Sequence, residues 1–381
     1  MESLDDTLAA LLAGGRPAGT VTRGLLIGLR AALTEVAPDD PAVAALDRLL
    51  AGSPPHRLLA GSPPAAAGPA PGAPLPTGTQ TAAPASPASR GLETTLAPLW
   101  ARAAAAADER EPGDPPDVPA SMWEELHLLS LRLAPEDRRE VQAHAADDVR
   151  GAGAIPGTTA QVTVLGPGHE VLIPQLLTGG HALHRGLATA PDAPLPIELM
   201  PYTSKLGGPG ADPATVAFVR LAVPVLHLVS LDRHLQHCLQ TLQFRGFAPL
   251  NAPAEQDRFR GQLLARITAL IDAAPGTSHW LECMVRLHEA VSSVVHLPPA
   301  TDVSWWGRLR MHAHTILRDA AAQLGPGLVK LPPNRFAAAR ALTAHDIPLK
   351  LPDSSGMVLA CVRVWSKIDD TENPGRVIYG S

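Results

Sequence analysis

The spacing of apolar residues predicts a small helical module at the N-terminus, over residues 1–52. Within it, Leu26, Leu29, Leu33 and Val36 recur at the three- and four-residue spacing of one helix face. Three short helices bury little apolar surface when they stand alone. We therefore expect this module to gain stability by docking on a partner protein or on the rest of the chain.

The helical period stops in residues 53–90, which have a proline every few positions and contain neither an acidic nor an aromatic residue. Such a composition is typical of a flexible, partly extended linker. The next segment, 91–150, carries 13 acidic residues and six arginines, for a local net charge of −7. The apolar spacing predicts helices there at 92–107, 119–133 and 135–149, with a loop between the first two.

The period then changes to that of β-structure. The stretch AQVTVLGPGHEVLIPQLL (160–177) has two alternating runs around Gly166, Pro167 and Gly168, which predicts a β-hairpin. A further strand is expected at LPIELMPYT (195–203). Two closing strands are expected at 357–365 and 375–380, and we expect them to join the hairpin in one sheet.

Between these strands, four long helices are predicted over 213–324. They cover 213–244, 254–273, 278–296 and 302–324, separated by segments that contain proline or glycine. A short helix is expected at 334–344. The whole pattern predicts a predominantly helical α+β protein: a three-helix module at 1–52, a disordered linker at 53–90, an acidic helical segment at 91–150 and an α+β main domain at 151–381.

Composition changes how the histidines are weighed. The chain has four lysines against 27 arginines, together with many alanines, prolines and glycines, as GC-rich codons impose. This indicates a high-GC genome, bacterial or viral. Because histidine codons rise with the same bias, the 15 histidines are weaker evidence for a metal than they would be in a balanced composition.

Charge and cysteine usage limit the partners and the compartment. The formal net charge of −6 argues against nonspecific nucleic-acid binding. No uninterrupted apolar run approaches 18 residues, and the N-terminus carries acids where a secretory signal needs cations, so a cytoplasmic protein without membrane contact is expected. The widely spaced Cys238, Cys283 and Cys361 are odd in number and fit reduced thiols.

The stretch LHLVSLDRHLQHCLQ (226–240) raises the question of a metal site. On a continuous helix, His227, His234 and Cys238 fall on one strip beside the leucine stripe. His234 and Cys238, one turn apart, could share a zinc ion, whereas His227 lies about 10 Å further along the axis. We favour a structural role without a cofactor and keep a zinc site at His234 and Cys238 as the alternative.

The last long helix carries two further candidate sites. A basic row could receive an anion or the carboxylates of a partner, although a solvated helix face is the favoured interpretation; the row comprises Arg308, Arg310, His314 and Arg318. Trp305 and Trp306 point about 100° apart on a helix. One indole can therefore enter the core while the other stays available for a partner contact.

A nucleophile is considered at Cys283, which has His279, Glu282, His288 and Glu289 nearby. Five helical positions place Cys283 and His288 on different faces. The signatures of phosphate-loop nucleotide hydrolysis, dinucleotide binding, zincin proteolysis and α/β-hydrolase chemistry are all missing from the sequence.

Two functions remain. The first is a non-enzymatic adaptor in a multi-protein bacterial system, such as a signalling, defence or assembly apparatus, with its N-terminal module contacting a protein partner. The second is a metal-dependent enzyme with a His/Cys site in the helices of 213–324. A third, less favoured hypothesis is a protein that binds an anion or nucleic acid through the basic row.

Overall fold

The computed structural model describes residues 87–106 and 119–381, which belong to one unit of the chain, 82–381. The predicted three-helix module at 1–52 lies outside the described residues, and so does most of the predicted linker. The last residues of that predicted linker, from Pro87 onward, already form the start of a helix.

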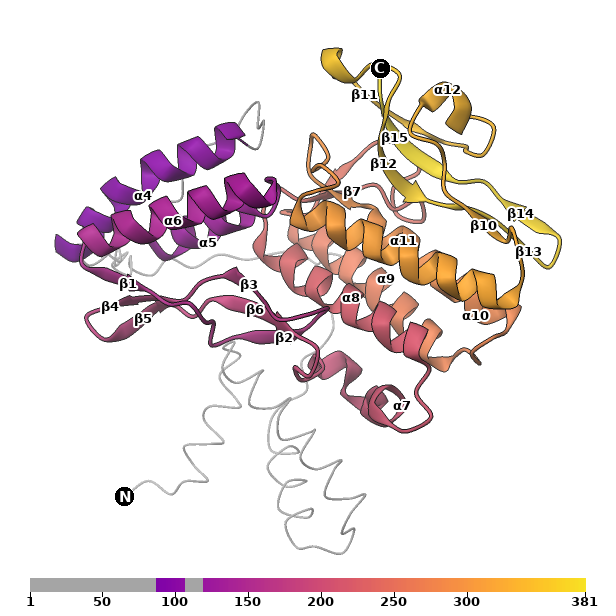
Figure 1. The fold of residues 1–381 in the computed structure, drawn as a ribbon, viewed down its shortest axis with the longest axis horizontal. Helices are drawn as coiled ribbons and strands as arrows, with labels where there is room; N and C mark the ends of the chain where they lie inside the picture. The colour runs from indigo at the N-terminus through magenta and orange to yellow at the C-terminus, as the bar shows by residue number, and fades with distance from the viewer. Residues whose placement is uncertain (1–86, 107–118) are drawn as a thin grey trace, which may run out of the picture. The chain divides into compact units, whose positions relative to one another are not determined.

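The described residues form a mixed α+β fold (Figure 1). The helices are α4 (Pro87–Ala106), α5 (Pro119–Ser130), α6 (Pro135–Gly151), α7 (Thr203–Gly207), α8 (Pro213–Leu231), α9 (Pro253–Asp272), α10 (Ser278–Ser292), α11 (Trp305–Leu324) and α12 (Phe336–Ala339), with 3-10 helices η1 (Ile197–Tyr202) and η2 (Pro352–Ser354). The strands are β1 (Ala154–Pro156), β2 (Thr163–Leu165), β3 (Glu170–Ile173), β4 (Leu176–Thr178), β5 (His181–His184), β6 (Leu187–Ala190), β7 (Gln236–His237), β8 (Ala248–Pro249), β9 (Val294–Val295), β10 (Val329–Lys330), β11 (Ile347–Leu349), β12 (Val358–Arg363), β13 (Trp365–Ile368), β14 (Thr371–Asn373) and β15 (Arg376–Gly380).

The three helices of the acidic segment are confirmed and pack on the strands that follow them. α5 contacts β3 and β5, and α6 contacts β1 (Figure 1). The indole of Trp123 on α5 donates a hydrogen bond of 2.8 Å to the carbonyl of Pro174. Because Trp100 and Trp123 belong to the same buried apolar cluster as the long helices, the acidic segment shares one core with the main domain.

The predicted β-hairpin is wrong in its pairing, although both of its strands exist. β2 and β3 each pair with β6, in the order β2-β6-β3, and the β2–β6 pair is parallel. Alternating residues identify a strand but do not specify its partner, so β6 inserts between the two strands. The strand expected at 195–203 is also wrong: η1 and α7 lie there, and Pro201 has no N–H to donate to a ladder.

The central helices α8 to α11 pack against one another (Figure 1). α8 begins as its sequence predicts, with Asp212 accepting a 2.7 Å hydrogen bond from the Thr215 N–H. Its most apolar window has a mean hydropathy of 1.9, long and apolar enough for a membrane span by length and composition alone. Since 61% of that window is buried inside the protein, α8 has the burial of a core helix.

The helix predicted over 213–244 is too long, because α8 ends at Leu231. Asp232 follows in an extended conformation, and its carboxylate accepts a 3.0 Å hydrogen bond from the His234 N–H. A side chain that bonds nearby backbone in this way competes with the helix. The chain then enters β7, which pairs with both β8 and β9.

The closing strands are confirmed, but they do not join β2 and β3. β15 pairs antiparallel with β12 and parallel with β11, whereas β13 lies in a separate sheet between β10 and β14. α10 contacts β12 and β13, and α11 contacts β10. The C-terminal sheets therefore cover one side of the helices, opposite to the β2-β6-β3 sheet in Figure 1.

Candidate functional site

The helical strip that suggested a zinc site does not form. His227 lies on α8, and the other candidate ligands follow after the end of this helix. The His234 ring donates a 2.7 Å hydrogen bond to Glu125, while the Cys238 thiol donates to the Ser293 carbonyl at 3.6 Å. Among the described residues, no group of three or more His, Cys, Asp or Glu side chains is arranged to hold a metal ion.

Two histidines share a local arrangement that fixes their protonation. In His184, Nδ1 accepts from the Gly186 N–H at 2.9 Å, so Nε2 is the donor to Glu124 at 2.9 Å. In His237, Nδ1 accepts from the Leu239 N–H at 3.2 Å, and Nε2 donates to Glu255 at 2.6 Å. Each neutral ring thus joins a backbone amide to a carboxylate on another element, with both nitrogens occupied.

Another histidine–carboxylate pair lies just after the end of α8. His296 donates a 2.8 Å hydrogen bond to Asp232, and both side chains are almost fully buried. Burial raises the pKa of the Asp232 carboxyl, but the His296 ring and the His234 N–H outweigh it and hold this pKa below its ordinary value. Asp232 therefore stays ionised and joins α8 to the segment after α10.

Glu125 is the point at which three segments meet. Its carboxylate is buried and accepts hydrogen bonds from the Trp100 indole at 2.9 Å, the Arg233 guanidinium at 2.8 Å and the His234 ring at 2.7 Å. These donors come from α4 and from the loop after α8. Glu125 thus connects the acidic helices to the main domain, a role that no local pattern in the sequence indicates.

Replacing Glu125 by Gln is expected to lower the free energy of unfolding by about 2 kcal/mol, because three donors lose an ionised acceptor. Urea unfolding measures this difference. The control is Glu124→Gln, the adjacent and more exposed residue. Within residues 87–106 and 119–381 it accepts only from His184, so its replacement should cost less than about 1 kcal/mol. Equal losses in the two variants would contradict the role assigned to Glu125.

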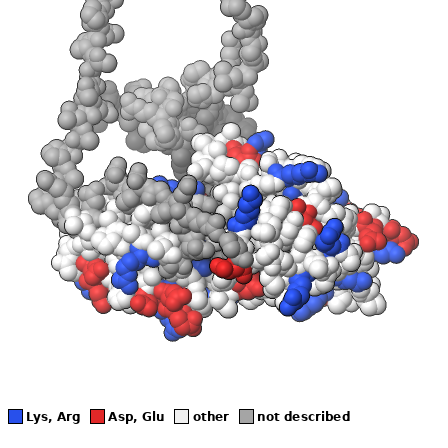
Figure 2. Space-filling view, turned by 90° about the horizontal axis from the view of Figure 1, so that it is seen from above, with Lys and Arg blue, Asp and Glu red and all other residues white. Residues whose placement is uncertain are grey.

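The predicted basic row is not a continuous surface. Arg310 is buried and donates to the Ala300 carbonyl at 2.6 Å, and the buried His314 ring bonds His288 at 2.6 Å. Arg308 and Arg318 are the more exposed members, and they pair with Glu170 and Asp319 respectively. On the face in Figure 2, basic and acidic side chains are interspersed wherever grey atoms do not cover them.

The predicted partner contact through Trp305 or Trp306 is wrong in its geometry. Both indoles are buried, with 5% and 2% of their surface exposed, and their rings meet edge to face at 5.1 Å. The edge expected to remain open is covered by the tertiary packing.

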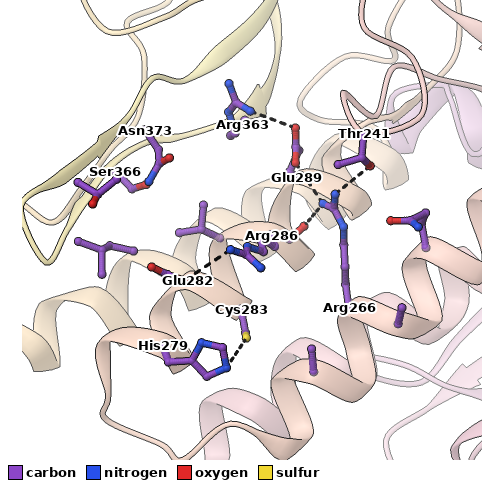
Figure 3. A pocket seen from close by; sticks show the side chains of 16 residues that line it. Thr241, Arg266, His279, Glu282, Cys283, Arg286, Glu289, Arg363, Ser366 and Asn373 are labelled. Atoms are coloured by element: carbon purple, nitrogen blue, oxygen red, sulfur yellow. Dashed lines mark hydrogen bonds and ion pairs between the residues drawn. The ribbon is translucent and has the colours of Figure 1, made fainter.

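A cavity of about 580 Å³ opens between α9, α10 and the C-terminal strands (Figure 3); it is called the α9–α10 cavity below. One face of α10 forms a wall, where chemically active side chains recur at helical spacing: His279, Glu282, Cys283, Arg286 and Glu289. The exposed Ala265 and Ala269 on α9 leave room opposite that wall. β13 and β14 supply Ser366 and Asn373.

The thiol in this cavity is not activated. Cys283 Sγ lies 3.7 Å from His279 Nε2, one turn earlier on α10 (Figure 3). Burial raises the pKa of the Cys283 thiol, so its thiolate is disfavoured at neutral pH. Burial likewise raises the pKa of Cys238 and that of Cys361 to about 12. None of the three cysteines, all of which lie in the described part of the chain, has a lowered pKa.

Charged groups converge at the other end of the cavity. Glu289 is buried, and its carboxylate lies 3.1 Å from Arg266 Nη1 and 3.5 Å from Arg363 Nη1 (Figure 3). Glu282 pairs with Arg286 at 3.6 Å closer to solvent. Sequence reasoning singled out the α10 residues but missed both of the arginines on Glu289, because they come from α9 and β12, far along the chain.

Comparison with known proteins gives no relative for this chain: no family model matches it, and neither a curated protein nor a solved structure is significantly similar to it.

Proposed function

We propose that this protein is a non-enzymatic adaptor of a multi-protein bacterial system, acting in the cytoplasm without a metal cofactor. In this proposal, residues 1–52 contact a protein partner and the remainder provides a folded body. Membrane and nucleic acid are not its partners. The observation that carries the proposal is the use of histidine as an internal connector, since His184 and His237 each have both ring nitrogens engaged by a backbone amide and a carboxylate.

The charge and thiol chemistry support the same proposal. A general base or a zinc ligand needs a free nitrogen lone pair, and a nucleophilic cysteine needs a lowered pKa. The His184 and His237 rings have their lone pairs occupied, and burial raises the pKa of Cys283. The two rings join segments of the fold and the Cys283 thiol is not activated, which favours a body that binds over one that reacts.

The sequence before α4 supports the tethered arrangement. As a flexible chain, a linker with the composition of residues 53–86 spans on the order of 30 Å. A partner that is bound to residues 1–52 would stay within that distance of the folded body. The effective concentration of the folded body near this partner would therefore be high. The adaptor would thereby keep two components together without a rigid contact between them.

The proposal is tested by affinity capture from cells of the source organism, comparing the full chain with residues 82–381. We expect a partner protein that the full chain captures at near-stoichiometric amounts and that residues 82–381 do not capture, while the thermal unfolding of residues 82–381 remains cooperative. Capture by residues 82–381 alone would contradict the role of the N-terminal module.

The metal-dependent alternative is tested on the same material by elemental analysis of untagged protein. We expect zinc and iron well below one equivalent, and no difference between the wild type and His234→Ala, since His234 bonds Glu125. Near-stoichiometric zinc that is lost in His234→Ala and in Cys238→Ser would overturn the non-enzymatic proposal.

A further inference from the structure

The inner end of the α9–α10 cavity carries more positive than negative charge. Glu289 is the single carboxylate there, and it is shared by Arg266 and Arg363. Arg363 donates through Nε to the Pro374 carbonyl and through Nη1 to Gln240, whereas its Nη2 donates to no group of the described chain. Two guanidinium groups on one carboxylate leave a net positive charge in a partly desolvated site, which favours an anion.

A buried hydroxyl in the same cavity has no partner. Ser366 on β13 is fully buried, and its Oγ makes no hydrogen bond within the described part of the chain. A buried hydroxyl without a partner costs about 1–3 kcal/mol. A ligand oxygen that accepts from Ser366 would remove this cost.

The arrangement of the walls indicates what else the ligand contains. In the view of Figure 3, Arg286 lies between Arg266 on one side and the strand residue Ser366 on the other. The apolar side chains of Val285 and Ile368 also line the cavity. Its volume of about 580 Å³ is within the range of small-molecule sites.

We propose that the α9–α10 cavity binds a small organic anion, with a carboxylate or phosphate-ester group held by Arg363, Arg286 and Ser366 and an apolar body against Val285 and Ile368. This proposal is independent of the adaptor function, since every residue that lines the cavity lies between Thr241 and Asn373, outside residues 1–52.

The test uses anilinonaphthalene sulfonate, a fluorescent monoanion with an aromatic body, titrated onto the full chain. We expect a single class of site from which benzoate or phenyl phosphate displaces the probe, while neutral benzyl alcohol at the same concentration does not. The better competitor identifies the anionic group as a carboxylate or a phosphate ester. Equal displacement by benzyl alcohol would reduce the site to an apolar cavity and overturn the proposal.

Two variants test whether the probe binds in this cavity. Ala269→Trp fills the cavity from an exposed position on α9, and its matched control is Thr268→Trp, one residue earlier and outside the lining. Arg286→Gln removes an exposed charge whose partner is Glu282, one turn away on the same helix. We expect Ala269→Trp and Arg286→Gln to weaken binding by about tenfold or more and Thr268→Trp by less than about twofold.

Unfolding temperatures equal to that of the wild type confirm that each variant is folded. The absence of probe binding to the wild type, or equal affinities in Ala269→Trp and Thr268→Trp, would overturn the proposal. Neither result would affect the capture experiment, which depends on residues 1–52.

Discussion

The free energy of unfolding is expected to fall by several kcal/mol between about pH 7.5 and about pH 5, because three buried histidines must stay uncharged in the folded state. Burial lowers the pKa of His127 and that of His314 from 6.5 to about 4, and lowers the pKa of His288 well below its ordinary value. The Nδ1 of His127 donates to the Trp123 carbonyl, and the other two rings bond each other.

The sign follows from proton binding in the two states. In the unfolded chain these rings bind protons below pH 6.5, whereas in the folded protein His127 and His314 do so only near pH 4. Their contribution to stability is therefore fully present above pH 6.5 and is lost as the pH falls toward 4. For His127 alone, about 2 kcal/mol is lost by pH 5.

His127→Phe separates this effect from general acid sensitivity. The His127 ring packs on Trp123 with centroids 4.2 Å apart, and its Nε2 has no partner in the described chain, so a phenyl ring loses one hydrogen bond, worth about 1 kcal/mol. We expect this variant to be less stable than the wild type at pH 7.5 and more stable at pH 5, measured by urea unfolding. His144→Gln, on an exposed face of α6, should leave the pH dependence unchanged. A parallel pH profile for His127→Phe and the wild type would contradict the assignment.

Arg376→Met is expected to lower the free energy of unfolding by at least about 3 kcal/mol, because one fully buried guanidinium serves three carbonyls. Arg376 donates to Cys238 O at 2.6 Å, to His345 O at 2.9 Å and to Phe244 O at 3.0 Å. These bonds tie β15 to the segment after α8 and to the residues before β11. Methionine fills a similar volume but donates to none of these carbonyls.

Two further variants sharpen this test. Arg376→Lys keeps the charge but lacks the planar fork that reaches several acceptors, so its stability should lie between those of Met and the wild type. Arg318→Met is the control, since Arg318 is exposed and, in the described part of the chain, pairs only with Asp319. The loss of stability in this variant should stay within about 0.5 kcal/mol. Similar losses for Arg376→Met and Arg318→Met in chemical unfolding would exclude the structural role of Arg376.

The candidate sites could be predicted from the sequence only where a single element carries them. The polar face of α10 could be recognised because His279, Glu282 and Cys283 lie within one helical period. The zinc pair at His234 and Cys238 rested on a helix that ends at Leu231, and the two residues bond different partners. That zinc pair remains an untested prediction.

Glu125, Arg376 and the arginines on Glu289 could not be found from the sequence. Each acts through partners far along the chain, such as Glu125 with Arg233 and Arg363 with Glu289. Neither charge nor spacing distinguishes these residues from exposed ones of the same type. Their burial and their partners are products of packing alone.

By itself, the sequence determined the elements whose ends are fixed by local chemistry. Thr277 and Asp212 cap α10 and α8 through their own side chains, Gly325 follows α11, and the apolar runs at β12 and β15 form strands as predicted. These signals act within a few residues, so they do not depend on contacts with distant parts of the chain.

Only the tertiary structure decided where α8 ends, which strand lies between β2 and β3, and which charged residues meet. The end of α8 depends on Asp232 bonding His296, and β6 pairs with both β2 and β3 across long stretches of chain. A local period cannot encode such choices, because they compare the free energies of contacts between distant segments. The α9–α10 cavity, with the unpartnered Ser366 on its wall, is likewise formed by contacts between distant segments.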